Sequence, residues 1–285
     1  MDLRELKSLW KKKGFRPRKR LGQNFLVDKN VRDNIVNALP LDSGLTVIEI
    51  GVGFGVMTFP IASRCARLFA VEKDKDICGI MGPVFDEKEN ITLVRSDILE
   101  LDFCGLAGGR EDVLVYGNIP YYISTPVIEK IITSSRCVRT AYLVMQEELA
   151  DRIASRPGPK SYGSVSCFVQ YYAEPRKVFK ISRNSFYPRP QVDSCLLELK
   201  IREKPAVEVK DEKLLFKVIR KAFSQRRKKA LNSLSHGDFL SIEKGTWHDI
   251  FDRCGIDLCS RAEDLSLPDY ARVADEVYQY NTASG

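Results

Sequence analysis

The chain has 285 residues, enough for one large domain or for a large and a small one. Its apolar fraction of 44% supports a hydrophobic core, yet no apolar run reaches the roughly 18 residues that a membrane-spanning helix needs. The formal net charge of +7 favours a polyanionic partner.

The first 20 residues are strongly basic. They contain nine Lys and Arg residues against two acids, Asp2 and Glu5. The segment lacks the apolar stretch of a secretory signal, and its acids are unlike an acid-poor transit peptide. We therefore expect residues 1–20 to form a basic N-terminal extension. We also expect the protein to be cytoplasmic and to have no membrane partner.

From residue 45 onward, apolar runs rich in β-formers alternate with segments of helical periodicity. The runs predict strands at 45–50, 68–71, 91–94, 113–116, 140–145 and 195–199. The helical spacing predicts helices at 57–65, 77–81, 127–132 and 165–172. Such alternation indicates an α/β fold, a Rossmann-like doubly wound parallel sheet, which we expect over residues 21–203.

The last part of the chain shows a different pattern. After a linker at 202–210, apolar residues follow a single helical face from Leu214 to Phe223, and no further alternating strands are evident. Residues 211–285 are therefore expected to form a small helical domain. A basic cluster begins this domain and predicts RNA binding, although a solvated helix face is the alternative: Lys217, Arg220, Lys221, Arg226, Arg227 and Lys228.

Polar residues follow the first three expected strands, where open α/β sheets bind their ligands. Gly51 and Gly53 allow a close backbone approach, Glu72 can accept from both hydroxyls of a ribose, and Asp97 can accept from the amino group of adenine. The G-x-G-x-G spacing at 51–55 differs from a dinucleotide site. This order favours S-adenosylmethionine over NAD, while a helix N-cap or a solvated loop is the structural alternative for each acid.

The fourth strand leads into Asn118-Ile119-Pro120-Tyr121. The Asn118 oxygen can accept a hydrogen bond from an amine, and the Tyr121 ring can stack on a base. Pro120 fixes its φ angle and removes a backbone donor, so that both side chains can point at one place. The tetrapeptide therefore predicts a pocket for a planar amine.

The eight cysteines include no Cys-x-x-Cys pair, and the chain has only two histidines. We therefore expect no metal site and reduced thiols throughout.

Six motifs in order make the chain resemble the rRNA adenine N6,N6-dimethyltransferases of the bacterial KsgA type. The resemblance runs from about Pro17 to Asn232, and the motifs cover residues 21–26, 49–55, 96–99, 117–126, 186–194 and 223–228. Val52 stands where the family often has proline. The resemblance implies that Asn24 and Leu26 close over the methionine part of the cofactor, and that Asn118 serves both cofactor and target.

The resemblance further implies dimethylation of two adjacent adenosines in a hairpin loop near the 3′ end of small-subunit rRNA. Asn118 and a backbone carbonyl of Ile119 or Pro120 would accept the N6 hydrogens of adenine. Tyr121 and Phe186 would clamp the flipped base, with a core aromatic as the alternative for Phe186. The expected partner is the immature 30S subunit, bound by a monomer.

Two other functions stay open at this point. A resistance methyltransferase of large-subunit rRNA shares the same pocket residues. A non-catalytic RNA-binding assembly factor is the other alternative, although such a factor would not need Glu72, Asn118 or Tyr121.

Overall fold

The structure is a computed structural model that describes residues 3–225, 227–237 and 239–283. Two compact units share the chain, and each is described by itself. The sheet unit comprises Met1–Ala150 and Glu174–Glu203, and the helical unit comprises Asp151–Ala173 and Lys204–Gly285. Among the described residues, every helix is too short or too polar to cross a membrane.

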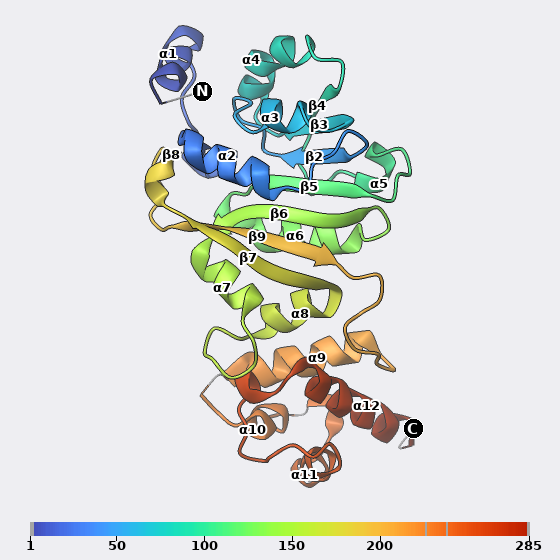
Figure 1. The fold of residues 1–285 in the computed structure, drawn as a ribbon. Coiled ribbons are helices and arrows are strands. Elements are labelled where there is room, and N and C mark those ends of the chain that lie inside the picture. The colour runs from blue at the N-terminus through green and yellow to red at the C-terminus, as the bar shows by residue number, and fades with distance from the viewer. Residues whose placement is uncertain (1–2, 226, 238, 284–285) are drawn as a thin grey trace. The chain divides into compact units, whose positions relative to one another are not determined.

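The sheet unit contains a seven-stranded sheet with the order β4-β3-β2-β5-β6-β9-β7 (Figure 1). Its strands are β2 (Thr46–Ile50), β3 (Arg67–Glu72), β4 (Ile91–Arg95), β5 (Val113–Asn118), β6 (Val138–Gln146), β7 (Ala173–Ile181) and β9 (Ser194–Ile201). The expected parallel sheet is confirmed for β2 to β6, whereas β9 runs antiparallel to β6. The chain order reverses between β2 and β5, and this switch point is where such sheets bind ligands.

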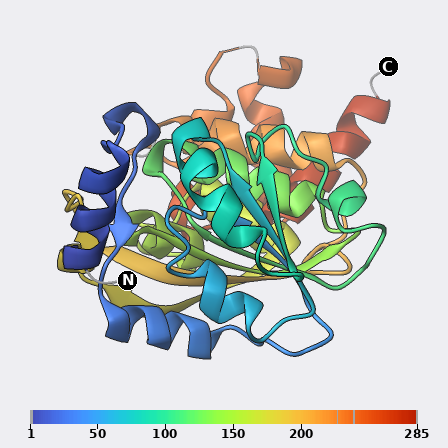
Figure 2. The ribbon, with the colours of Figure 1, turned by 90° about the horizontal axis from the view of Figure 1, so that it is seen from above.

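Helices lie on both faces of this sheet (Figure 2). They are α2 (Lys29–Ala38), α3 (Thr58–Ala62), α4 (Lys75–Phe85), α5 (Phe103–Leu106) and α6 (Ser124–Thr133). Asp28 caps α2 and Asp74 caps α4 by accepting from backbone N–H groups in the first turn. The central strands β2 and β5 are buried on both sides, which explains why most of their residues are apolar.

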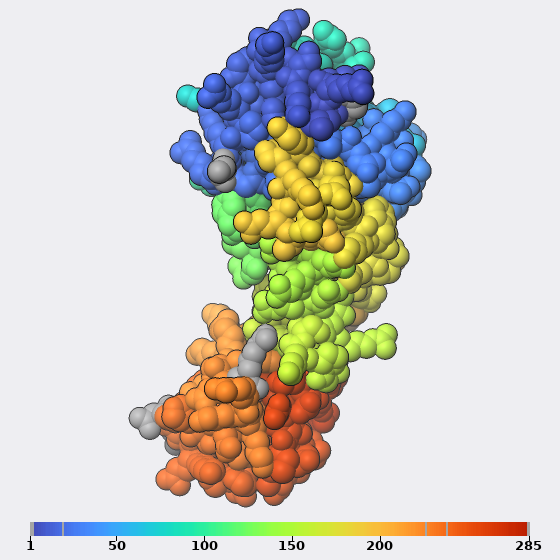
Figure 3. Space-filling model, turned by 90° about the vertical axis from the view of Figure 1, so that its left-hand side faces the viewer, coloured from blue at the N-terminus to red at the C-terminus, as the bar shows by residue number. Residues whose placement is uncertain are grey.

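The basic N-terminal segment also contributes to the core of the sheet unit. Residues Leu3–Lys13 form α1, which buries Leu6 and Trp10. The Trp10 ring lies 5.4 Å from Phe25 and 6.0 Å from Phe54 between ring centroids. Figure 3 shows this segment against the loop that carries Tyr187, whose ring lies 5.6 Å from Trp10. Part of the expected extension is therefore packed structure.

The helical unit is built around Trp247, Tyr270 and Leu215, all fully buried. Its helices are α8 (Ser164–Tyr172), α9 (Glu212–Ala222), α10 (Ala230–Leu234), α11 (Lys244–Arg253) and α12 (Leu267–Ala283), while α7 (Glu147–Ala154) contains the boundary between the units. Cys167 and Tyr171 of α8 belong to this core. Residues 151–173 pack with the C-terminal helices. The expected domain limits of 21–203 and 211–285 stay a prediction.

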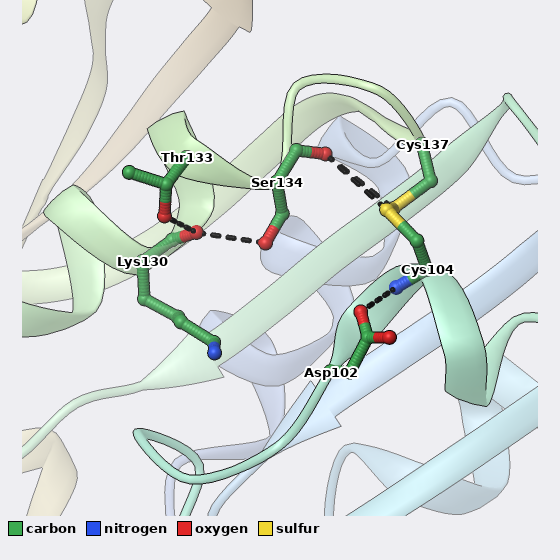
Figure 4. Close-up of a disulfide and its surroundings, with 6 residues drawn as sticks. All are labelled: Asp102, Cys104, Lys130, Thr133, Ser134 and Cys137. Carbon is green, nitrogen blue, oxygen red and sulfur yellow. Dashed lines mark hydrogen bonds between the residues drawn. A yellow bond between two sulfur atoms is a disulfide. The ribbon is translucent and has the colours of Figure 1, made fainter.

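The expectation of reduced thiols throughout is wrong for one pair. Cys104 and Cys137 form a disulfide with their Cα atoms 5.4 Å apart (Figure 4). It joins α5 to the turn before β6, where Ser134 caps α6. The sequence separation of 33 hid this proximity, because β5 and α6 lie between the two cysteines in the chain. The six other cysteines form no disulfide in the described chain.

Candidate active site

One cavity of the sheet unit lies at the carboxyl ends of β2, β3, β4 and β5. All nine residues predicted for the cofactor and the target line it: Asn24, Leu26, Gly51, Gly53, Glu72, Asp97, Asn118, Tyr121 and Phe186. They come from six separate segments of the chain. Parallel strands end at one edge of a sheet, so this gathering follows from the topology.

The glycine turn after β2 gives the cavity a floor of backbone. Gly51, Gly53 and Gly55 have φ angles of 72°, 53° and 75°, a region that side chains other than glycine rarely adopt. A Cβ atom on Gly53 would lie only 3.1 Å from the Phe25 ring. Glycine is therefore required both by the turn and by the close approach of Phe25.

Glu72 ends β3, and its carboxylate is held in place by two backbone donors. Gly53 N donates to Oε2 at 3.3 Å, and Asp74 N donates to Oε1 at 2.8 Å. Burial raises the pKa of Glu72, and these two N–H groups act against that rise. Each oxygen retains a further acceptor position, as the predicted contact with ribose hydroxyls requires.

Asp97 follows β4 and is already paired on the rim of the cavity. Its Oδ1 accepts from Leu99 N at 3.1 Å, and its Oδ2 forms an ion pair with the exposed Lys73. Burial alone would raise the pKa of Asp97, but the bonds from Lys73 and Leu99 N outweigh it and hold the pKa below its usual value. Asp97 therefore presents a charged acceptor, as an adenine amino group would need.

Asn118 ends β5 and links this strand to the N-terminal segment. Its Nδ2 donates to the backbone oxygen of Asn24 at 2.9 Å, which leaves Oδ1 directed to other donors. Gln23 donates to Asp74 Oδ2 at 2.8 Å, and Arg18 pairs with Asp74 at 3.1 Å. The segment around Asn24 is thereby fixed to both β5 and the start of α4.

Tyr121 and Phe186 differ in how firmly they are held. Tyr121 is half-buried, and its hydroxyl lies 3.3 Å from Ser194 Oγ. Phe186 is only 4% exposed, and its backbone pairs with Leu26 in the small sheet of β1 (Phe25–Leu26) and β8 (Phe186–Tyr187). Phe186 therefore packs in the core and also borders the cavity. Its stacking role stays a prediction.

Comparison with known proteins identifies the family to which the chain belongs. A family model described as ribosomal RNA adenine dimethylase matches residues 14–278. The chain belongs to this family. It is therefore an S-adenosylmethionine-dependent methyltransferase that acts on ribosomal RNA.

Relatives in the family are similar over nearly their whole length. The chain is 37% identical over 272 residues to the ribosomal RNA small subunit methyltransferase A of Clostridium botulinum (strain Langeland), covering 95% of this chain and 98% of that protein. It is 40% identical over 275 residues to the protein of the same name from Moorella thermoacetica, covering 94% of each.

Two solved structures share the fold at 22% identity. One is a dimethyladenosine transferase from Plasmodium falciparum, with a TM-score of 0.76 over 91% of this chain and 98% of that one. The other is the 23S rRNA methyltransferase ErmE, with a TM-score of 0.70 over 90% of this chain and 100% of that one. The expected fold class is confirmed by these similarities and by the sheet order.

The cavity residues fit S-adenosylmethionine. Glu72 and Asp97 supply carboxylate acceptors at neighbouring strand ends, and the glycine turn leaves room beside them. A further buried acceptor, Glu49 Oε2, lines the cavity without a hydrogen-bond partner. Within the described residues there is no cluster of His, Cys, Asp and Glu that could hold a metal ion.

The predicted RNA-binding residues of the helical unit divide into two groups. Lys217, Arg220 and Lys221 lie on α9, and Lys221 Nζ donates to the backbone oxygen of His236 at 2.7 Å. Arg227 and Lys228 line a shallow hollow, and Arg226 lies outside the described residues. No Asp or Glu of the described chain lines this hollow, whose other cationic side chains are Lys229, Lys244 and Arg261.

Sequence reasoning missed Lys244 and Arg261, which lie beyond the predicted basic cluster at 217–228 in the sequence. Ala230 N donates to Ser260 O at 2.8 Å, and this bond brings the segment of Arg261 beside that of Lys228 and Lys229. Sequence reasoning also assigned no role to Glu49. The available signal was an acidic residue between the apolar residues Ile48 and Ile50.

Proposed function

We propose that this protein dimethylates N6 of two adjacent adenosines in the 3′-terminal hairpin loop of small-subunit rRNA. Family membership and the small-subunit names of relatives at 36–40% identity support this substrate. The observation that carries the proposal is the meeting of Asn118, Glu72 and Asp97 in one cavity. The protein would act as a monomer on the immature 30S subunit in the cytoplasm.

In this proposal, Asn118 prepares the nitrogen of the target base. When bound, S-adenosylmethionine supplies an electrophilic methyl group on a sulfonium centre. Adenine N6 is a weak nucleophile because its lone pair is delocalised into the ring. An N6–H bond accepted by Asn118 Oδ1 would favour a more tetrahedral nitrogen and would aim its lone pair.

A backbone carbonyl is the second acceptor for N6. The Pro120 oxygen already accepts from Ile123 N at 3.1 Å, which makes the Ile119 oxygen the better candidate. Ile119 N is itself held by Val144 O at 3.0 Å, so that the peptide after Asn118 has a fixed orientation. Fixed acceptors lower the barrier because they need no reorganisation during the reaction.

Tyr121 and Phe186 would hold the flipped base from two sides of the cavity. Stacking on an aromatic side chain contributes about 1–3 kcal/mol per base. The β1–β8 pairing joins Phe186 to Leu26, so the base clamp and the proposed methionine-side segment share one small sheet. A fixed conformation of the segment around Phe186 would therefore favour a fixed conformation of the segment around Leu26, and the reverse.

The basic hollow of the helical unit would bind the phosphate backbone. Five Lys and Arg side chains line it without a described acid, which suits a polyanion. Such contacts position an RNA without reading its sequence. The N-terminal basic residues would add further backbone contacts.

Methylation of purified small subunits that lack the modification tests the proposal. With labelled S-adenosylmethionine, we expect N6,N6-dimethyladenosine in the small-subunit rRNA after nucleoside analysis. Label that appears only in a parallel reaction with large subunits would instead favour the resistance-type alternative, whose fold ErmE shares. Subunit binding without any methyl transfer would favour a non-catalytic assembly factor.

A further inference from the structure

Glu49 is a carboxylic acid in the middle of the buried sheet. It belongs to β2, is 2% exposed, and lies between Ile48 and Ile50, which are also buried. Its side chain lines the cofactor cavity, and Oε2 has no hydrogen-bond partner. A buried polar oxygen without a partner is costly, so its presence at a ligand cavity calls for a functional reason.

The groups that face Glu49 offer it no positive charge. They are Thr58 of α3, Glu72 of β3, Tyr116 of β5 and Cys65 of the turn before β3. The Thr58 hydroxyl approaches the carboxyl group, yet its Oγ1 also lacks a hydrogen bond. Three of these four neighbours are acids, and no Lys or Arg of the described chain contributes to the titration of Glu49.

This setting stabilises the neutral acid. Burial raises the pKa of Glu49 to about 8, with Glu72 adding to the rise and Thr58 opposing it. Burial likewise raises the pKa of Glu72 and of Tyr116, and it raises that of Cys65 to about 11. An uncompensated carboxylate at this position would be strongly unfavourable.

We propose that Glu49 carries a proton in the cofactor-free protein and releases it when S-adenosylmethionine enters the cavity. This inference rests on the proposed function, which brings a sulfonium and an ammonium group into a cavity whose one Lys or Arg among the described residues, Lys73, is already paired with Asp97 on the rim. The O–H bond of the Glu49 carboxyl group breaks, the proton passes to the buffer, and the carboxylate remains opposite the cofactor's positive charge. A nearby opposite charge favours the ionised form of a buried acid.

The coupling has a defined dependence on pH. An acid with a pKa of about 8 is roughly nine-tenths protonated at pH 7, so binding should release most of that proton there. Cofactor affinity should rise about tenfold per pH unit below pH 7, where the amino group of the cofactor, with an ordinary pKa of about 8, stays largely protonated.

Titration calorimetry of the full chain with S-adenosylmethionine measures this release directly. At pH 7, the observed heats should differ between phosphate and Tris in proportion to the ionisation heats of the buffers. In Glu49→Gln the release should be lost and the affinity should no longer rise between pH 6 and pH 7, while the exposed Glu89→Gln should retain both. Equal heats in both buffers for the wild type at pH 7 would overturn the proposal while leaving the proposed function intact.

A neutral ligand and a spectroscopic signal complete the test. Adenosine lacks both cationic groups, so its binding should release no proton, and equal release with adenosine would contradict the proposal. The infrared difference spectrum of the wild type should lose a protonated-carboxyl C=O band on cofactor binding, which keeps the test independent of variant folding. The absence of any binding by S-adenosylmethionine would overturn the proposed function and this inference together.

Discussion

Asn118 Nδ2 donates to the backbone oxygen of Asn24 at 2.9 Å, across 94 positions of sequence. The bond fixes the amide orientation, because the donor side of Asn118 faces Asn24 and the acceptor side faces elsewhere. The proposed catalytic acceptor is thus oriented by the same segment that is proposed to cover the cofactor.

The first prediction concerns this amide. Asn118→Ala should lower methyl transfer by about 10²–10³-fold, the usual effect of losing one such polar group. Asn118→Asp should also be strongly impaired, because a carboxylate cannot donate to the Asn24 oxygen. Dimethyladenosine formation measures both, and binding to the small subunit should remain close to wild type. Equal loss of binding and transfer would contradict the assigned role.

The second prediction concerns the N-terminal helix. Trp10 packs against Phe25 and Phe54, and these rings border the glycine turn of the cofactor cavity. Trp10→Ala should destabilise the protein by about 3 kcal/mol and weaken cofactor binding. Trp10→Phe is the matched control, since the buried Nε1 has no hydrogen bond to lose. Urea unfolding and calorimetry would report both effects, and an unchanged cofactor affinity in Trp10→Ala would show that α1 does not support the turn.

The sequence predicted most of the sheet and its ligand edge, because buried parallel strands are short apolar runs that end in polar residues. It missed β7, whose Glu174, Pro175 and Arg176 disrupt the alternation of an edge strand. It also missed the packing of α1, since the basic residues of that segment conceal the spacing of Leu6 and Trp10. The nine predicted cavity residues could be identified from the ends of the expected strands and from the motifs. The positions of Glu49, Lys244 and Arg261 relative to the cavity and the hollow become evident only in the three-dimensional structure.

The third prediction concerns the basic hollow. If Lys244 and Arg261 contact phosphates, replacing either by Ala should reduce the salt dependence of RNA binding by about one unit of log K against log salt. The exposed Lys88, which belongs to the sheet unit, provides the control substitution to Ala. Unchanged slopes for both hollow variants would exclude the hollow as a backbone site.

The fourth prediction concerns the cysteines. In the unreduced, denatured protein, six thiols should react with an alkylating reagent, and all eight should react after reduction. Cys104→Ser should leave the number of reactive thiols at seven with or without reduction, because Cys137 loses its partner. Mass spectrometry counts the labels, and eight labels without reduction would contradict the disulfide.

The last prediction concerns stability and pH in the cofactor-free protein. Folding raises the pKa of Glu49 from its ordinary 4.5 to about 8, so between these values the folded state binds more protons than the unfolded state. The stabilising effect of that proton is complete below pH 4.5 and is lost as the pH rises through 8. Relative to Glu49→Gln, the wild type should therefore lose up to about 4 kcal/mol of unfolding free energy between pH 5 and pH 9.

Urea unfolding at several pH values measures this difference, and the exposed Glu89→Gln serves as the control because it should follow the wild type. Saturating S-adenosylmethionine should reverse the trend, since a cation beside Glu49 favours the carboxylate that high pH produces. The increase in melting temperature on cofactor addition should thus be larger at pH 7 than at pH 6 in the wild type, since the amino group of the cofactor stays largely protonated at both. In Glu49→Gln the increase in melting temperature should be the same at both pH values. An equal increase at both pH values in the wild type would show that Glu49 does not titrate in the cavity.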